Sequence, residues 1–294
     1  MKRILITGAN KGIGLATVEA ALNHHHDVAV VLGVRDIERG QAAIERLCEH
    51  HPARASRLEL LEIDVVDDQS VVRARDSLIT RHGADPYPLF GLVNNAGIGL
   101  GSNDIDAVVN TNTLGVKRVC DAFIPLVKSA GRVVNISSAS GPKFVSLCSE
   151  EMRAFFQDAS VNWSEIETLL RSVISQPQDA RHFQSLGLGA INAYGLSKAC
   201  VSLYTMVLAR ENPELCVNAC TPGFIETDLT RPQAEASGAS PADLGMKSPE
   251  SGTVPILFLL FGMPPTSGHY YGSDAKRSPL HFYRAPGDPE YFGP

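Results

Sequence analysis

Two residues in the second half of the chain have the types and spacing needed to move a proton. Tyr194 and Lys198 lie four positions apart in the stretch NAYGLSKAC, and on a helix that spacing is about one turn. A free tyrosine titrates at about pH 10, and a neighbouring cation lowers this pKa because it favours the phenolate. The pair could therefore act as a proton donor, or it could be an ordinary exposed helix pair.

A serine pair provides a second candidate for this chemistry. Ser137 and Ser138 end the stretch NISS, which follows an apolar run at 132–136. A hydroxyl aimed at a substrate oxygen stabilises the negative charge that develops there during reduction. Because side chains alternate along a strand, the two serines should face opposite sides, so only one of the two should point into a site.

A glycine-rich turn near the start of the chain has the composition of a phosphate-binding loop. The stretch ITGANKGIG follows an apolar run and opens a helical pattern. Glycines allow a pyrophosphate to approach the backbone, and the helix N-terminus offers it free N–H groups. The spacing is TGxxxGxG rather than GxGxxG, so a tight turn without a ligand is the alternative. The residues expected to bind are Gly8, Asn10, Lys11, Gly12, Ile13 and Gly14.

Strand-like and helical patterns alternate on both sides of these residues. Apolar strand-like runs occur at 3–7, 28–34, 58–63, 90–94 and 132–136, with helical patterns at 12–23, 37–50, 68–82 and 104–129. Strands that alternate with helices predict βαβ units, a parallel sheet and helices on both of its faces.

The second half of the chain first interrupts this alternation and then resumes it. Residues 139–190 carry two amphipathic helical patterns, SEEMRAFFQ and NWSEIETLLRSVI. A helix at 192–211, a strand at 215–220, a long loop at 222–248, a helix at 249–261 and a strand at 268–272 follow. We expect an α/β fold: one doubly wound Rossmann domain over 1–294, with a seven-stranded parallel sheet and a helical insertion at about 141–188.

The composition excludes several classes of protein. The chain is 44% hydrophobic and 20% charged with a net charge of −6, which suits a globular protein and argues against nucleic-acid binding. The apolar stretch TVPILFLLFGMPP is too short to span a membrane. Six cysteines without a CxxC pair or zinc-like spacing predict free thiols, no metal site and a cytoplasmic location.

Six short motifs occur in an order that is more specific than any one of them. They are TGxxxGxG, NNAG at 94–97, NTNTLG at 110–115, NISS, YxxxK and PG at 222–223. In this order they resemble the short-chain dehydrogenase/reductase family. The resemblance implies hydride transfer to an aldehyde or ketone, with alcohol oxidation as the reverse reaction. It also implies four catalytic residues: Tyr194 as general acid, Lys198 as its tuner, Ser138 as a ligand of the carbonyl oxygen, and Asn112 at a helix kink that holds a relay water.

The cofactor expected from the same resemblance is NADP(H). Arg35 ends the second strand and Lys11 lies in the glycine turn, and two cations favour a ribose 2′-phosphate. Asp36 could instead face the ribose if the strand ended one residue later. By resemblance, Tyr194 and Lys198 also contact the cofactor, and Ala139, Tyr194 and Phe224 join Ser138 around the substrate. The remaining cofactor-binding expectations are Asp64, Val65, Asn94, Ala96, Gly97, Pro222, Gly223, Ile225 and Thr227.

The distance between the serine and the tyrosine points to a subgroup of this family. Ser138 and Tyr194 are 56 positions apart, about forty more than in simple members, and such an insertion resembles the monomeric carbonyl reductases. Its helices could cover a surface used for association elsewhere in the family, through Trp163, Leu169, Leu170 and Ile174, or could form a substrate lid. We expect a monomer that acts on a small carbonyl compound. A non-catalytic NADP(H)-binding regulator or redox sensor is the alternative.

Overall fold

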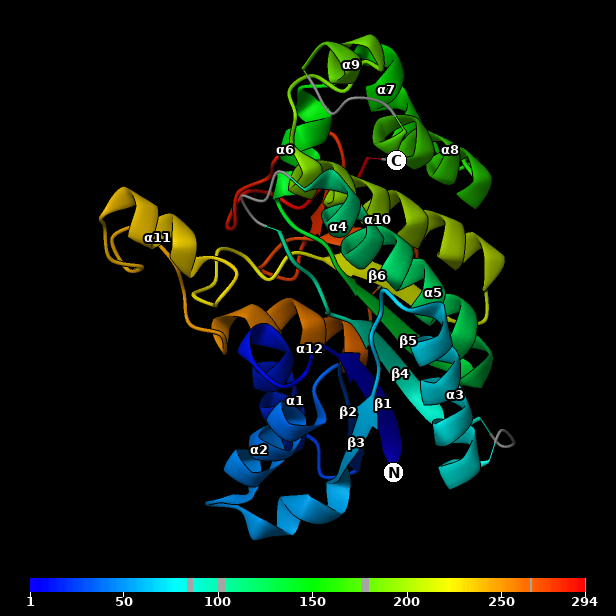
Figure 1. Ribbon diagram of the computed structural model, residues 1–294, viewed down its shortest axis with the longest axis vertical. Coiled ribbons are helices and arrows are strands. Elements are labelled where there is room, and N and C mark those ends of the chain that lie inside the picture. Colours follow the sequence, from blue (N-terminus) through cyan, green and yellow to red (C-terminus); the bar gives the residue numbers. More distant parts are fainter. Residues whose placement is uncertain (84–86, 100–103, 176–179, 265, 294) are drawn as a thin grey trace.

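The computed structural model describes residues 1–83, 87–99, 104–175, 180–264 and 266–293. Its central feature is one sheet with helices on both faces (Figure 1). The strands lie in the order β3-β2-β1-β4-β5-β6-β7-β8. Their bounds are β1 Lys2–Thr7, β2 Val28–Val34, β3 Leu58–Glu62, β4 Leu89–Asn94, β5 Val127–Ile136, β6 Cys216–Cys220, β7 Tyr270–Tyr271 and β8 Arg277–Ser278.

The pairing within this sheet confirms the predicted fold class and corrects its strand count. Neighbouring strands from β3 to β7 in this order all pair in parallel. In this register Ile6 of β1 lies beside Leu32 of β2 and Val93 of β4. The described residues contain an eighth strand, β8, which pairs antiparallel with β7. Two-residue strands in a tail rich in proline and glycine carry too weak an apolar pattern to be found from the sequence.

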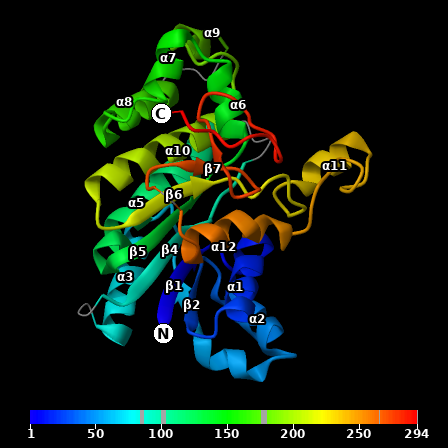
Figure 2. The same cartoon turned by 180° about the vertical axis from the view of Figure 1, so that it is seen from behind.

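The strands are apolar on both sides because helices cover both faces of the sheet. Leu5 belongs to the hydrophobic core on one side, whereas its neighbours Ile4 and Ile6 belong to the core on the other. The views in Figures 1 and 2 show the two helical layers. One layer holds α1 (Gly12–His24), α2 (Ile37–Cys48) and α12 (Val254–Phe261); the other holds α3 (Asp68–His82), α4 (Ile105–Val109), α5 (Gly115–Phe123) and α10 (Ala193–Glu211).

The helix expected over 104–129 is shorter and less regular than predicted. A π-helical segment, Asn110–Leu114, separates α4 from α5, and β5 already begins at Val127. Pro125 explains the early end of the helix, because its ring removes a backbone donor and clashes with the preceding turn. The long loop expected at 222–248 also contains a short helix, α11 (Arg231–Ser237).

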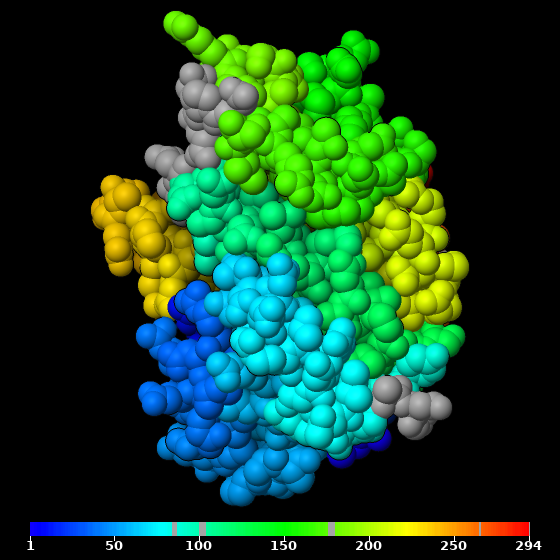
Figure 3. All heavy atoms as spheres, turned by 45° about the vertical axis from the view of Figure 1, so that its right-hand side comes forward, coloured from blue at the N-terminus to red at the C-terminus, as the bar shows by residue number. Residues whose placement is uncertain are grey.

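The described residues of the insertion form four helices, and the insertion lies at one end of the molecule (Figure 3). They are α6 (Ser140–Ser146), α7 (Glu150–Phe155), α8 (Trp163–Ile174) and α9 (Ala180–Ser185), and the insertion residues 176–179 lie outside the described part of the chain. The two predicted amphipathic patterns correspond to α7 and α8. Helix α8 starts with a capping box between Asn162 and Glu165, which satisfies two backbone donors at its N-terminus.

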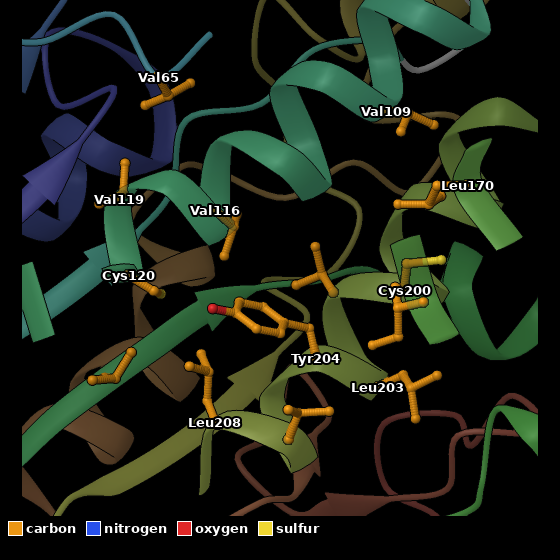
Figure 4. Packing of buried hydrophobic residues seen from close by; sticks show 14 of the residues in the cluster. Val65, Val109, Val116, Val119, Cys120, Leu170, Cys200, Leu203, Tyr204 and Leu208 are labelled. Carbon is orange, nitrogen blue, oxygen red and sulfur yellow. The ribbon is translucent and has the colours of Figure 1, made fainter. Parts of the chain in front are cut away.

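The face that α8 buries differs in part from the expected one. Ile166, Leu170 and Val173 are fully buried against the core, whereas Leu169 and Ile174 are only partly buried. The ring of Trp163 meets the ring of Tyr204 edge-on, with centroids 4.9 Å apart. Figure 4 shows Leu170 of α8 facing the residues of α10. Positions 163, 166, 170 and 173 have the spacing of one helical face. The predicted packing residues included Leu169 and Ile174, which lie off this face.

Helix α12 carries the apolar stretch near the C-terminus. It spans eight residues and buries Ile256, Leu259 and Leu260 against the sheet. Within the ranges that the structure describes, every helix is too short or too polar to cross a membrane.

Candidate active site

A cavity of about 1300 Å³ lies at the carboxyl ends of the strands. The residues that follow seven strands in succession line it: Gly8, Arg35, Ile63, Asn95, Ser137, Thr221 and Gly272. Ligands of open parallel sheets bind at this edge, where loops from neighbouring strands meet. The topology therefore brings segments from across the whole sequence to one site.

The glycine turn forms one wall of the cavity and leaves no room for side chains. Gly8 and Gly12 have φ angles of +66° and +55°, which other residues rarely adopt. A Cβ on Gly14 would lie 2.5 Å from Gly8 O and from Asn95 Nδ2. No side chain caps the N-terminus of α1, so its free N–H groups are available to an anion.

Thr7 and Asn95 hold this turn in place, and the sequence reasoning did not single them out. The amide of Asn95 donates to Thr7 O at 2.8 Å, and Thr7 Oγ1 accepts from the backbone N–H groups of Asn95 and Ala96. Both residues belong to motifs that the sequence shows, TG and NNAG. The signal was therefore present, but only the contacts show that these side chains join the two motifs.

The two cations expected at the ribose phosphate have different surroundings. Arg35 is exposed and lines the cavity, and no ion pair of Arg35 occurs in the described part of the chain. Asp36 is the N-cap residue of α2, and its carboxylate accepts a hydrogen bond from Arg39 N. The Asp36 carboxylate is therefore engaged by the helix. Lys11 Nζ lies 2.7 Å from Asp228, across the cavity on the loop after β6.

The serine and the tyrosine meet at the other end of the cavity. Ser138 lies two residues beyond β5 and Tyr194 lies in the first turn of α10; both line the cavity, and the Ser138 hydroxyl is close enough to act on the pKa of the Tyr194 phenol. Ser137 Oγ instead donates to the backbone oxygen of Lys198. Lys198 Nζ lies 5.6 Å from the ring centroid of Tyr194 and donates to Ile136 O at 2.8 Å.

Burial shifts the two titrating groups in the directions that favour their neutral forms. It raises the pKa of Tyr194 to about 12, although the hydrogen bond with Ser138 opposes the shift. It also lowers the pKa of Lys198 to about 8. The sequence predicted that Lys198 would lower the tyrosine pKa. The pKa shifts in the opposite direction, because desolvation of the buried phenol is the largest cause, while the Lys198 ammonium donates to a backbone carbonyl.

Asn112 lies in the π-helical segment, as the expected helix kink requires. The side chain of Asn112 exchanges two hydrogen bonds with the backbone of Ile98, at 2.9 and 3.0 Å, and donates to Ser197 Oγ. A Cβ on Gly97 would lie 3.3 Å from Asn112 Oδ1 and 3.6 Å from Lys198 Nζ. Asn112 therefore fixes the loop after β4 beside the lysine.

The structure brings most of the remaining expected residues to the cavity. Asn94 is the exception, since it is buried and its amide donates to Asn135 Oδ1 at 2.8 Å. Asp64 accepts a hydrogen bond from Val66 N, whereas Asp67 caps α3. The other expected residues that line the cavity are Gly8, Asn10, Gly12, Ile13, Gly14, Val65, Ala96, Gly97, Ala139, Pro222, Gly223, Phe224, Ile225 and Thr227.

The C-terminal tail supplies lining residues that the sequence did not identify individually. Tyr270, Tyr283 and Arg284 reach the cavity, together with Lys143 of α6. By contrast, no described residue of 144–193 lines it. The part of the insertion beyond Lys143 therefore covers helices rather than the cavity in this structure.

A doubly wound sheet with a glycine turn at one end of its cavity and a serine–tyrosine pair at the other defines a Rossmann-type nucleotide-binding protein. The family model described as short chain dehydrogenase matches residues 2–171. The chain is 32% identical to carbonyl reductase [NADPH] 1 of Mus musculus, over 94% of this chain and 97% of that protein. It is also 32% identical to the Homo sapiens protein of the same name, over 90% of this chain and 92% of that one. The chain belongs to the short-chain dehydrogenase family.

Solved structures of other members share this fold. Salutaridine reductase from Papaver somniferum superposes with a TM-score of 0.75 at 23% identity, covering 92% of this chain and 99% of its own. The NADPH-bound carbonyl reductase from chicken fatty liver superposes with a TM-score of 0.64 at 23% identity, covering 95% and 98%. These similarities show the fold and leave the substrate open.

Proposed function

We propose that the protein is an NADPH-dependent reductase of aldehydes or ketones, which also catalyses the reverse alcohol oxidation. The observation that carries this proposal is that Ser138 and Tyr194 line the same cavity as the glycine turn, with the serine near enough to act on the tyrosine pKa. The names of the relatives, carbonyl reductase [NADPH], support the cofactor and the reaction class. Consumption of NADPH in the presence of aldehydes, diketones, quinones and cyclic ketones tests the proposal.

The residues of the cavity fit a dinucleotide. The space that a Cβ on Gly8, Gly12 or Gly14 would fill lies beside the uncapped N-terminus of α1, which suits a pyrophosphate. Arg35 stands beyond the end of β2, where the adenosine ribose of a bound dinucleotide lies in Rossmann folds. When bound, the nicotinamide ring supplies the hydride.

The chain's own residues would handle the oxygen and the proton. Ser138 would donate a hydrogen bond to the carbonyl oxygen, and Tyr194 would donate the proton as negative charge develops there. Lys198 must be charged to favour the phenolate form of Tyr194. Because its pKa is lowered to about 8, the charge on Lys198 would depend on the cofactor bound beside it. Asn112 would keep the Ile98 loop against the lysine.

Replacing Arg35 by alanine is expected to reduce the preference for NADPH over NADH about tenfold. The exposed guanidinium would lose a charge-assisted contact with the 2′-phosphate, which NADH lacks. The measurement is kcat/KM for each cofactor with one aldehyde. Arg39→Ala is the control, because Arg39 already pairs with Asp36 at 3.2 Å. If the ratio of kcat/KM with NADPH to kcat/KM with NADH is unchanged in Arg35→Ala, Arg35 does not bind the 2′-phosphate.

We also propose that residues 1–294 fold as one domain and that the protein is a cytoplasmic monomer. Each strand in the described ranges joins the same sheet, and all six cysteines are free, as expected in a reducing compartment. Helix α8 packs on α4 and α10 and occupies a surface that association would need. Sedimentation should give a species of about 31.6 kDa, and a stable dimer would contradict the proposed role of the insertion.

A further inference from the structure

The end of the cavity away from the glycine turn carries a lysine among aromatic rings. Lys143 Nζ lies 4.4 Å from the ring centroid of Tyr283, and both residues line the cavity, as does Phe224. Tyr194 and Tyr270 line the same cavity. The shared cavity and the contact with Tyr283 make Lys143 a candidate for binding the part of a substrate remote from its carbonyl.

Packing holds α6 in an orientation that presents this lysine to the cavity. A Cβ on Gly141 would lie 3.1 Å from Ala199 N, and one on Gly195 would lie 2.8 Å from Phe144 Cβ, so α6 and α10 are in close contact. Gly141 and Phe144 thus form the face of α6 against α10. Ser140 and Lys143 are three positions apart, share the other face and line the cavity.

The tail that carries Tyr283 is fixed by the buried side chain of the next residue. Arg284 pairs with Asp274, donates to Ser278 Oγ at 2.9 Å and donates to the backbone oxygens of Ala285 and Asp288. This guanidinium is therefore engaged within the protein. Lys143 is exposed and, in the ranges that the structure describes, forms no ion pair.

The carboxylates that line the cavity are all engaged elsewhere. Asp228 pairs with Lys11 and with Arg231, and Glu226 also pairs with Arg231. Asp64 accepts a hydrogen bond from Val66 N. The substrate end is therefore cationic and has no neutralising acid among the described residues, so a negative charge on a ligand would be stabilised there.

We propose that Lys143 selects carbonyl substrates that carry a carboxylate on a planar frame. The lysine would bind the carboxylate while Tyr283 and Phe224 contact the planar part, and the carbonyl would lie at Ser138 and Tyr194. This inference rests on the proposed reductase function and specifies its substrate class. A charge-assisted contact at an accessible site corresponds to a selectivity of about 5- to 10-fold.

The test compares a charged substrate with a neutral one in the wild type and in two variants, so that differences in size and intrinsic reactivity between the acid and its ester cancel between proteins. The rates of NADPH oxidation with 4-formylbenzoate and with its methyl ester are measured for the wild type, Lys143→Gln and Lys128→Gln. Lys128 is the matched control, since it lies on β5 beside Phe90 and away from the cavity. In the wild type, kcat/KM should favour the acid about 5- to 10-fold, and this advantage should shrink at high salt.

Lys143→Gln should abolish the preference for the acid and leave the ester unchanged, whereas Lys128→Gln should match the wild type. A wild type that reduces both compounds without preference, or a Lys143→Gln variant that keeps the preference, overturns the assignment of Lys143. If the wild type reduces neither these compounds nor other aldehydes and ketones with NADPH, the reductase function itself fails. The ester thereby separates the two failures.

Discussion

Tyr194→Phe is expected to lower kcat for carbonyl reduction at least about 10²-fold while the enzyme still binds NADPH. The substitution removes one hydroxyl that donates the proton, and general acid catalysis by a positioned group contributes about 10²–10⁴-fold. The ring remains, so its packing at the start of α10 is kept. The measurement is the rate of NADPH oxidation at saturating aldehyde, with cofactor binding followed separately by fluorescence.

A second tyrosine on the same helix provides the matched control. Tyr204 lies ten positions further along α10, with its hydroxyl buried among apolar residues near Cys120 (Figure 4), and it does not line the cavity. Tyr204→Phe should retain the rate of the wild type. Equal rates in the wild type and Tyr194→Phe would mean that this phenol is not the proton donor.

Gly14→Ala is expected to weaken NADPH binding by about 10²-fold. The added methyl group would lie 2.5 Å from Gly8 O and from Asn95 Nδ2, so the turn must move. Charge-assisted hydrogen bonds to a pyrophosphate are each worth about 1.5–3 kcal/mol, and displacement of the turn weakens more than one of them. Overpacking also lowers the free energy of unfolding by about 1–3 kcal/mol, which thermal unfolding measures alongside cofactor affinity.

Gly238→Ala distinguishes a local clash from a general effect of losing a glycine. Gly238 follows α11 with φ +68°, and a Cβ there meets no atom within 4 Å. This variant should show some loss of stability from its backbone conformation and normal NADPH affinity. Normal affinity in Gly14→Ala as well would contradict the assignment of the glycine turn to the cofactor.

The sequence predicts the architecture well where the signal is local. Strands β1–β6 are mostly apolar, and their alternation with helices predicts a doubly wound sheet. Residues one or two positions after those strands, such as Gly8, Arg35 and Ser138, reach the cavity because the topology places every carboxyl end at one edge. Both serines line the cavity, but the Ser137 hydroxyl donates to the backbone of Lys198, so Ser138 stays the predicted substrate ligand.

Features that depend on tertiary contacts could not be read in the same way. Asn94 and Asn95 are identical neighbours, yet only Asn95 lines the cavity, because strand alternation turns Asn94 toward Asn135. The direction of the Tyr194 pKa shift depends on burial, which the spacing to Lys198 does not reveal. Tyr283 reaches the cavity through the internal contacts of Arg284 in an irregular tail, where no periodic pattern exists.

The central claim is that the cavity joins a nicotinamide cofactor to a carbonyl compound at Ser138 and Tyr194. The most direct measurement is the initial rate of NADPH oxidation by the purified protein with a panel of aldehydes, diketones, quinones and cyclic ketones, run in parallel with NADH. The account predicts turnover of at least one carbonyl class, faster with NADPH than with NADH. NADPH binding without turnover of any class would contradict it and would indicate a nucleotide-binding regulator instead.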